Sequence, residues 1–232
     1  LDTTGVSRSA NFGTAKTIIL PVKGEDRRYL HTFGANADFR VEDIPHALLD
    51  RARVFYLGGY LVLPALEQAA LSALLRRARA GGARTVLDVV VAAGGAGWSL
   101  SVLEQVLPHT DLFLPNREEA QLLTGERDPA RQAERLLAAG CDRVVITQGA
   151  DGALYADRHD QFFTPAFPVE MVDGSGAGDA FAAGVIVGLL EGWDARQMLR
   201  FASAVGASAC TRLGCTAGVF TRAEAEAFLQ AH

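Results

Sequence analysis

One segment combines a flexible backbone with acidic side chains: the run from Asp173 to Phe181, with the sequence DGSGAGDAF. Three glycines in five positions make a poor helix interior, yet a strongly apolar helical stretch follows at once. We therefore expect a glycine-rich loop that leads into a helix N-terminus, where free backbone N–H groups and the helix dipole favour an anion. Asp179 at that place is either a helix-capping residue or a general base that takes a hydroxyl proton during phosphoryl transfer.

Two other segments with possible nucleotide chemistry follow predicted strands. The run from Thr147 to Gly152 is either a plain hairpin turn or a turn whose glycines let a nucleotide approach, with the Thr147 hydroxyl at a strand's carboxyl end. Asn116 and Glu119 have the spacing of a helix capping box. The alternative is that they hold hydrated Mg²⁺ and phosphate oxygens.

The lysines exclude one common way of binding phosphate. A P-loop needs a lysine after its glycines, but the only lysines are Lys16 and Lys23. Backbone amides and a divalent metal must then handle any phosphate, with arginine as a further candidate. Asp88, a single acid in an apolar strand, is either a strand-end ligand or a buried carboxylate with satisfied hydrogen bonds.

Composition narrows the class of protein. The 232 residues are 49% hydrophobic and carry a net charge of −5, which supports a sizeable core and argues against a nucleic-acid or anionic-membrane surface. No apolar run is long enough to span a bilayer, and there is no signal-peptide pattern. The three cysteines form no CxxC pair, so we expect free thiols and a cytoplasmic location.

Strands alternate with amphipathic helices from about Phe39 onward, which predicts a mostly parallel sheet covered on both faces. Helices are expected over residues 64–80, 99–107, 118–123, 128–139, 176–191, 195–210 and 222–230, and strands over 54–57, 85–91, 111–114, 143–147, 153–156 and 162–164. The front differs, because residues 14–21 and 27–33 read as a hairpin with a turn at Lys23–Asp26. The prediction is an α/β core over 39–232, preceded by a small β unit and a hinge over 1–38.

In this order, the segments resemble the ribokinase-like carbohydrate kinases, also called the phosphofructokinase-B family. The run Asp173–Phe181 is similar to the family's C-terminal signature, Asn116 and Glu119 to its Asn-x-x-Glu motif, and Thr147, Gly149 and Gly152 to its nucleotide turn. Residues 34–36 resemble the place where the family's lid strands return to the core, and 201–214 the helix and loop of the adenine pocket. The fold implied is a three-layer α/β/α core with a small β lid.

The resemblance implies a role for each matching residue. Asp179 would be the catalytic base, and the N–H groups of Gly176, Ala177 and Gly178 would form an anion hole. Asn116 and Glu119 would act around Mg²⁺ and the phosphates. The ATP path would be lined by Thr147, Gly149 and Gly152, together with Ser203, which stands where relatives often carry Asn.

A monovalent-cation loop, as several members use for K⁺, would involve Asp173 and Ser175, with backbone carbonyls near Ala209, Arg212 and Gly214. The activity implied is ATP- and Mg²⁺-dependent phosphorylation of an alcohol group on a sugar or similar small polyol. A nucleoside or vitamin kinase of the same fold and a catalytically silent nucleotide-binding fragment are the alternatives.

Two expectations concern the front of the chain. Family chains begin with a strand and a glycine-rich stretch that contacts the sugar, and they reach the lid afterwards. This sequence opens at what resembles mid-lid, so we expect that N-terminal segment to be lacking. The unpaired edges of the hairpin invite pairing with a second copy, which predicts a homodimer through the lid.

Overall fold

The core is built on one six-stranded sheet. The structure is a computed structural model that describes residues 2–20, 28–91 and 97–232. The sheet has the order β3-β4-β5-β6-β7-β8, with β3 to β6 parallel and β7 and β8 antiparallel to their neighbours. The bounds are β3 (Val54–Leu57), β4 (Arg84–Leu87), β5 (Leu112–Phe113), β6 (Arg143–Thr147), β7 (Gly152–Asp157) and β8 (Gln161–Pro165). The predicted α/β fold with a mostly parallel sheet is confirmed.

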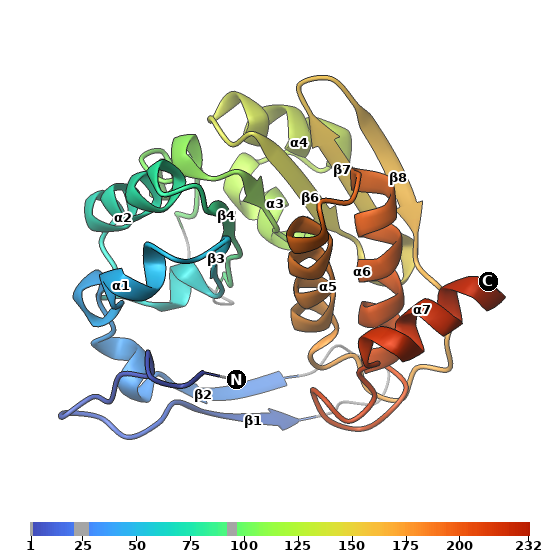
Figure 1. Cartoon of the computed structure of the whole chain (residues 1–232), viewed down its shortest axis with the longest axis horizontal. Coiled ribbons are helices and arrows are strands. Elements are labelled where there is room, and N and C mark those ends of the chain that lie inside the picture. Colours follow the sequence, from blue (N-terminus) through green and yellow to red (C-terminus); the bar gives the residue numbers. More distant parts are fainter. Residues whose placement is uncertain (1, 21–27, 92–96) are drawn as a thin grey trace.

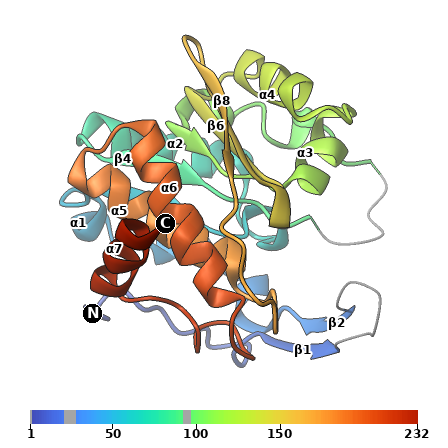
Figure 2. The ribbon, with the colours of Figure 1, turned by 90° about the vertical axis from the view of Figure 1, so that its right-hand side faces the viewer.

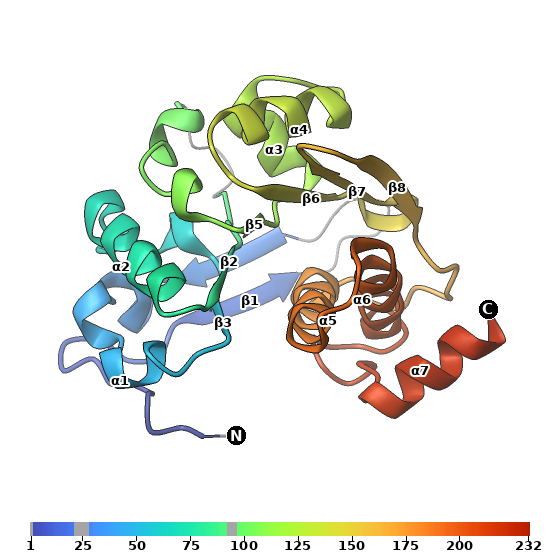
Figure 3. The ribbon, with the colours of Figure 1, turned by 45° about the horizontal axis from the view of Figure 1, so that its top comes forward.

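Neighbouring strand residues alternate between two buried faces, so each strand is apolar throughout. Leu87 and Phe113 point into one cluster, whereas Val86 and Leu112 point into another. The first face is covered by α2 (Gln68–Ala80), α3 (Arg117–Thr124) and α4 (Pro129–Ala138), the second by α5 (Ala177–Glu191) and α6 (Ala195–Ala209). Figure 3 shows the three layers, with α3 and α4 on one side of the sheet and α5 and α6 on the other.

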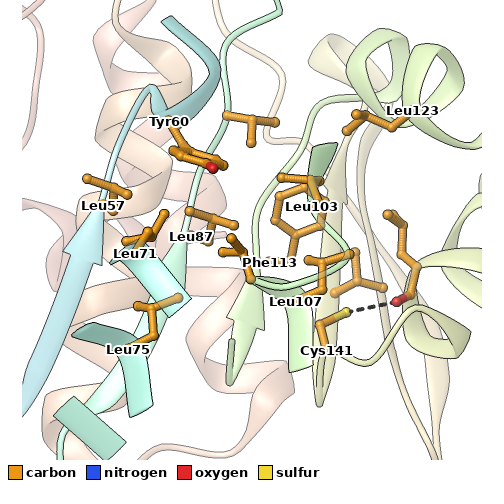
Figure 4. Packing of buried hydrophobic residues seen from close by; sticks show 14 of the residues in the cluster. Leu57, Tyr60, Leu71, Leu75, Leu87, Leu103, Leu107, Phe113, Leu123 and Cys141 are labelled. Atoms are coloured by element: carbon orange, nitrogen blue, oxygen red, sulfur yellow. Dashed lines mark hydrogen bonds between the residues drawn. The ribbon is translucent and has the colours of Figure 1, made fainter. Parts of the chain in front are cut away.

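The larger cluster is drawn in Figure 4, where Leu71 and Leu75 of α2 meet Leu87 and Phe113 of the sheet. Cys141 lies in the same cluster, and its thiol donates a hydrogen bond to the carbonyl of Leu136 at 3.3 Å. Burial raises the pKa of the Cys141 thiol to about 12. This cysteine is therefore a core residue, and all three cysteines are free, as predicted.

The second layer is held together by small residues on α5. A Cβ atom at Gly184 would lie 2.6 Å from Cα of Ala202, and one at Gly188 would lie 2.5 Å from Cγ of Met198. The two helices therefore pack backbone to backbone, which fixes the direction of α5. Helix α7 (Arg222–Ala231) packs outside them through Ala225. In the described residues, no helix combines the length and apolarity needed to cross a bilayer.

The front of the chain forms a separate two-stranded antiparallel sheet, β1 (Lys16–Leu20) with β2 (Arg28–Thr32), below the core in Figures 1 and 2. We call these strands the lid. Their predicted turn at Lys23–Asp26 lies outside the described residues. After β2 the chain turns at Gly34, where a side chain would collide with the backbone of Gly13 and Ala15. The division at residue 38 stays a prediction.

Several predicted bounds need correction. The helix expected over residues 99–107 is wrong: two single 3₁₀ turns stand there, η4 (Leu100–Val102) and η5 (Leu107–His109), and Pro108 has no N–H to continue a helix. The strand expected over 85–91 ends at Leu87: the Asp88 N–H still donates to Leu57 O of β3, but the Asp88 carbonyl accepts from the Tyr60 N–H in the turn after β3. The other short elements are η1 (Gly34–Ala37), η2 (Val41–Asp43), α1 (His46–Leu49), η3 (Tyr60–Val62) and η6 (Gly149–Asp151).

Candidate active site

Helix α5 begins with a glycine that no other residue type could replace without strain. Gly176 is the N-cap residue, with φ 78° and no side-chain cap. A Cβ atom there would collide with the carbonyl of Cys215 and lie 2.9 Å from its Cα. The loop after α6 therefore presses on the turn that starts α5, and the glycine is required both for its conformation and for this contact.

The amides of the first turn of α5 are largely unused. The Ala177 N–H donates to Gly174 O at a long 3.3 Å. Among the described residues, the N–H groups of Gly178 and Asp179 have no hydrogen-bond acceptor, and a Cβ at Gly178 would meet only open space. This is the arrangement in which a helix start can receive an anion.

Asp179 lies in the first turn of α5, three residues after the N-cap, and is exposed. Within the described residues its carboxylate accepts no hydrogen bond, and the helix start has no side-chain cap. The N-cap residue of α5 is thus Gly176, and Asp179 caps the helix through no hydrogen bond. Its carboxylate is free to meet a ligand beside the open amides.

The loop before α5 is tied to the loop after α6 by Asp173. One carboxylate oxygen accepts hydrogen bonds from the Ser175 backbone at 2.9 Å and its hydroxyl at 2.7 Å, and the other accepts from the Gly214 N–H at 3.0 Å. The N–H groups of Val172 and Asp173 donate to the Cys210 carbonyl. The structure thus brings Asp173, Ser175 and Gly214 together, as the family resemblance implies.

Asn116 and Glu119 form the predicted capping box at the start of α3. Asn116 Oδ1 accepts from the Glu119 N–H at 2.8 Å, and Glu119 Oε2 accepts from the Asn116 N–H at 2.9 Å. Burial, together with the charge of Asp88, raises the pKa of Glu119 to about 7, against the lowering effect of hydrogen bonds from the Asn116 and Val91 backbones. The local capping interpretation is confirmed, and Glu119 is also a partly buried carboxylate near a second one.

That second carboxylate belongs to Asp88, directly after β4. The Tyr56 hydroxyl donates to Asp88 Oδ2 at 2.8 Å. Burial raises the pKa of Asp88 to about 6, opposed by this hydrogen bond, and the charge of Asp179 raises it further. Burial and the charges of Asp88 and Asp179 likewise raise the pKa of Tyr56. Asp88 is thus within electrostatic range of both Asp179 and Glu119.

The turn from Thr147 to Gly152 connects two antiparallel strands, so it is a hairpin turn as one interpretation predicts. Gly152 is needed for packing, because a Cβ there would collide with Thr164 O of β8 and lie 2.9 Å from Ala166 N. Gly149, with φ 58°, has open space around it. The Thr147 N–H donates to Pro115 O at 3.1 Å, which places this turn beside the start of α3.

Two further residues concern the site: Ser203, which the sequence analysis names, and Tyr56, which it does not. Ser203 is buried in α6, 6% exposed. Tyr56 is absent from the sequence-based prediction, since nothing in the sequence gives the register that pairs it with Val86 of β4. In the described parts of the chain, no group of three or more His, Cys, Asp and Glu side chains has the geometry of a metal site.

Comparison with known proteins gives the family. The model for the pfkB family carbohydrate kinases matches residues 1–222. The chain belongs to this family. The sheet order and the three layers described above agree with the ribokinase-like fold of this family.

Among pfkB-type relatives, a ribokinase of Bacillus subtilis is 34% identical over 126 residues, which cover 54% of this chain and 42% of that protein. A 5-dehydro-2-deoxygluconokinase of Clostridium perfringens is 28% identical over 193 residues, covering 78% of this chain and 56% of that protein. The chain therefore spans about half the length of these relatives.

Solved structures share the fold. A crystal structure of an E. coli protein provisionally assigned as ribokinase II, in complex with ATP and Mg²⁺, has a TM-score of 0.77 at 25% identity and covers 96% of this chain and 72% of that one. A fructokinase of Xylella fastidiosa with bound ATP has a TM-score of 0.85 at 24% identity and covers 100% of this chain and 78% of that one.

Proposed function

We propose that this protein transfers the γ-phosphoryl group of ATP, with Mg²⁺, to an alcohol group of a sugar or similar small polyol. The observation that carries the proposal is the start of α5, where Asp179, free of hydrogen bonds from the described residues, stands beside unused backbone amides. Family membership and the sugar kinases among the relatives support the substrate class.

Asp179 is the proposed general base. The acceptor hydroxyl oxygen forms a bond to the γ-phosphorus as the bond to the bridging oxygen of ADP breaks, and the hydroxyl proton passes to the Asp179 carboxylate. A positioned base of this kind contributes about 10²–10⁴-fold to the rate. The Asp179 side chain is exposed at the first turn of α5, where an acceptor hydroxyl can reach it.

The amides of Gly176, Ala177 and Gly178 form the proposed anion hole. They donate to phosphoryl oxygens while charge develops on them, and the glycine turn that presents them is held by Cys215. Among the described residues, the Gly178 N–H has no hydrogen-bond acceptor, whereas the Ala177 N–H donates to the Gly174 carbonyl. Base and anion hole then occupy a single helical turn.

The residues present fit Mg²⁺. The oxygen donors near the site are the Glu119 carboxylate and the Asn116 side-chain amide, and a hard cation prefers such ligands. Repulsion between the nearby carboxylates also favours a positive charge among them. Since the described residues form no closed metal cage, Glu119 and Asn116 would hold the ion through water and phosphate oxygens. Bound Mg²⁺ would neutralise phosphate charge. The ATP and Mg²⁺ held by the E. coli structure support this part.

The remaining nucleotide contacts belong to the turn from Thr147 to Gly152. Thr147 offers a hydroxyl at the carboxyl end of β6, and Gly149 leaves open space for a ribose or phosphate. Gly152 acts indirectly, by letting β7 lie close to β8. Ser203 is buried, so its proposed part in the adenine pocket is to shape the pocket wall.

Asp173 and Ser175 are the proposed centre of a monovalent-cation loop, together with carbonyls near Gly214. Support comes from the hydrogen bonds that hold these residues in one place beside the anion hole. Replacing Na⁺ by K⁺ in the assay should raise the turnover rate, and equal rates in the two salts would contradict this part.

A homodimer through the lid and a cytoplasmic location are also part of the proposal. The apolar side chains of Ile18, Leu20 and Leu30 are 59%, 43% and 60% exposed, which supports pairing with a second copy. Light scattering at micromolar concentration should give twice the chain mass, and a monomer would contradict the dimer. The free cysteines support the cytoplasm.

The experiment that tests the function is an acceptor screen with the full-length protein. ADP release is measured with ATP, Mg²⁺ and a panel of sugars, polyols, nucleosides and vitamin alcohols. We expect the highest kcat/KM for a sugar or polyol. A nucleoside or vitamin as best acceptor would overturn the substrate class, and ATP binding without turnover on any acceptor would identify a silent nucleotide-binding protein.

A further inference from the structure

Tyr56 and Asp88 form a rigid pair at the carboxyl end of two neighbouring strands. The Tyr56 hydroxyl donates to Asp88 Oδ2 at 2.8 Å. The backbone of Asp88 is held as well, because its N–H donates to Leu57 O at 2.8 Å and its carbonyl accepts from the Tyr60 N–H at 3.2 Å. Side chain and backbone of Asp88 are thus both fixed by β3 and the turn that follows it.

The Tyr56 ring is fixed in turn. It packs against the buried cluster beneath α5, and a Cβ at Gly58 would lie 2.9 Å from its hydroxyl oxygen and 3.1 Å from its ring. The ring therefore fills the space that a side chain at residue 58 would need. Packing of the ring thus holds the Tyr56 hydroxyl at hydrogen-bond distance from Asp88.

The direction of α5 places the pair beside the proposed active site. The Arg53 guanidinium, just before β3, donates to the carbonyl of Leu190, near the C-terminal end of α5. Because α5 packs along β3, its opposite end, with Asp179, lies at the carboxyl end of that strand, where Tyr56 and Asp88 are. The effect of the Asp179 charge on the pKa of both Asp88 and Tyr56 agrees with this placement.

We propose that Tyr56 is a positioning residue that acts through Asp88, holding a second negative charge beside Asp179. A fixed negative charge near a general base favours transfer of a proton to that base. In the position set by Tyr56, the Asp88 charge would act on Asp179 from the carboxyl end of β4, while the acceptor hydroxyl would approach the exposed side of the helix turn. This inference rests on the proposed function, and it adds two residues to the machinery proposed there.

A purely structural role makes a different prediction, and the chain offers a matched control. Tyr155 of β7 is also a strand tyrosine whose hydroxyl donates to an aspartate, Asp157 Oδ2, at 2.7 Å. In the strand register Asp157 lies opposite Arg143, the first residue of β6, and so at the end of the strands away from the start of α5. Loss of either hydroxyl should cost similar stability, whereas only the loss at Tyr56 should affect catalysis.

The test is a double-mutant cycle in the full-length protein with its best acceptor. Tyr56→Phe keeps the ring and removes the hydroxyl, and Asp88→Asn removes the charge. We expect Tyr56→Phe to lower kcat about tenfold, with KM for ATP within about twofold of the wild-type value and a melting temperature like that of Tyr155→Phe. In the Asp88→Asn background, the same substitution should change kcat by less than about twofold, because its partner charge is already gone.

Three results would overturn the inference: kcat of Tyr56→Phe equal to that of Tyr155→Phe, additive losses in the double variant, or a rise of KM for ATP with kcat unchanged. Each of them leaves an active wild-type enzyme and therefore leaves the proposed function intact. Failure of the proposed function has a separate signature, no turnover by the wild type and by Tyr155→Phe, and it removes this inference as well.

Discussion

Helices α3 and α5 both start at the carboxyl-end edge of the core, but their N-termini are built in different ways. At α3, Asn116 and Glu119 satisfy two backbone N–H groups with their own side chains. At α5, the N-cap is Gly176, which has no side chain, and the described residues leave the amides of Gly178 and Asp179 without an acceptor. A side-chain cap satisfies the amides of a helix N-terminus and stabilises it, whereas an uncapped N-terminus keeps a site for an anion.

The other capped helices sharpen this comparison. Side chains of Asp128, Asp194 and Thr221 cap α4, α6 and α7 in the same way as Asn116 caps α3. Four of the described helices thus have side-chain caps, whereas the N-cap of α5 is a glycine in close contact with the Cys215 backbone. Helices α1 and α2 also lack a side-chain cap, but α5 combines an uncapped start with a glycine N-cap and an aspartate in its first turn. Substitutions at this start should affect activity more than stability.

Among substitutions that change the backbone or the caps of the helix starts, the largest effect is expected from Gly176→Ala. The new Cβ would make the existing positive φ unfavourable and would collide with Cys215, so the amide turn must move. A displacement of about 1 Å costs on the order of 10²-fold in rate, and the melting temperature should fall by several degrees. Turnover and thermal melting measured on one preparation check both.

Gly192→Ala is the matched control for that substitution, since Gly192 ends the same helix with φ 71° and has open space around it. It should cost about 1–2 kcal/mol of stability with turnover unchanged. Equal losses of turnover in the two variants would show that the whole helix matters rather than its open start.

A smaller effect is expected from Glu119→Gln. Glutamine can still accept a hydrogen bond from the Asn116 N–H, so the cap of α3 should persist, while the charge is lost. The Mg²⁺ concentration for half-maximal rate should rise about tenfold or more, with little change in melting temperature below about pH 5, where Glu119 is protonated. An unchanged Mg²⁺ requirement would leave Glu119 as a capping residue only.

The smallest effect concerns the pH dependence of stability. The pKa of Glu119 is raised from its ordinary 4.5 to about 7 by burial and by Asp88. Its contribution to stability is therefore fully present below about pH 4.5 and is lost as pH rises through about 7. Metal-free wild type should lose stability between pH 5 and 8 relative to Glu119→Gln, by roughly 3 °C or more in melting temperature. Parallel melting curves of the two proteins across that range would contradict the raised pKa.

The sequence predicts what depends on neighbours along the chain. The glycine loop at 173–179, the capping box and the alternation of strands and helices are all local patterns, and the structure contains them. The chain also brings Asp173 to Gly214 as expected, 41 residues apart. That pairing came from resemblance to a family, because no local pattern carries it.

The rest depends on contacts between distant residues. Tyr56 meets Asp88 only because β3 and β4 pair in one register, and a shift of one residue would turn it to the other face. Residues 99–107 have helical spacing, yet the buried side chains of Leu103, Val106 and Leu107 hold the segment in short turns. Tertiary packing outweighs local propensity there.

The central claim, that the open start of α5 is catalytic, is tested most directly by Asp179→Asn in the full-length protein. Asparagine keeps the shape of the side chain and removes its ability to accept a proton. The account predicts a loss of kcat of at least ~10²-fold, with melting temperature and ATP affinity close to wild type. Asp194→Asn, at the capped start of α6, should by contrast leave kcat unchanged. Wild-type turnover by Asp179→Asn would contradict the account.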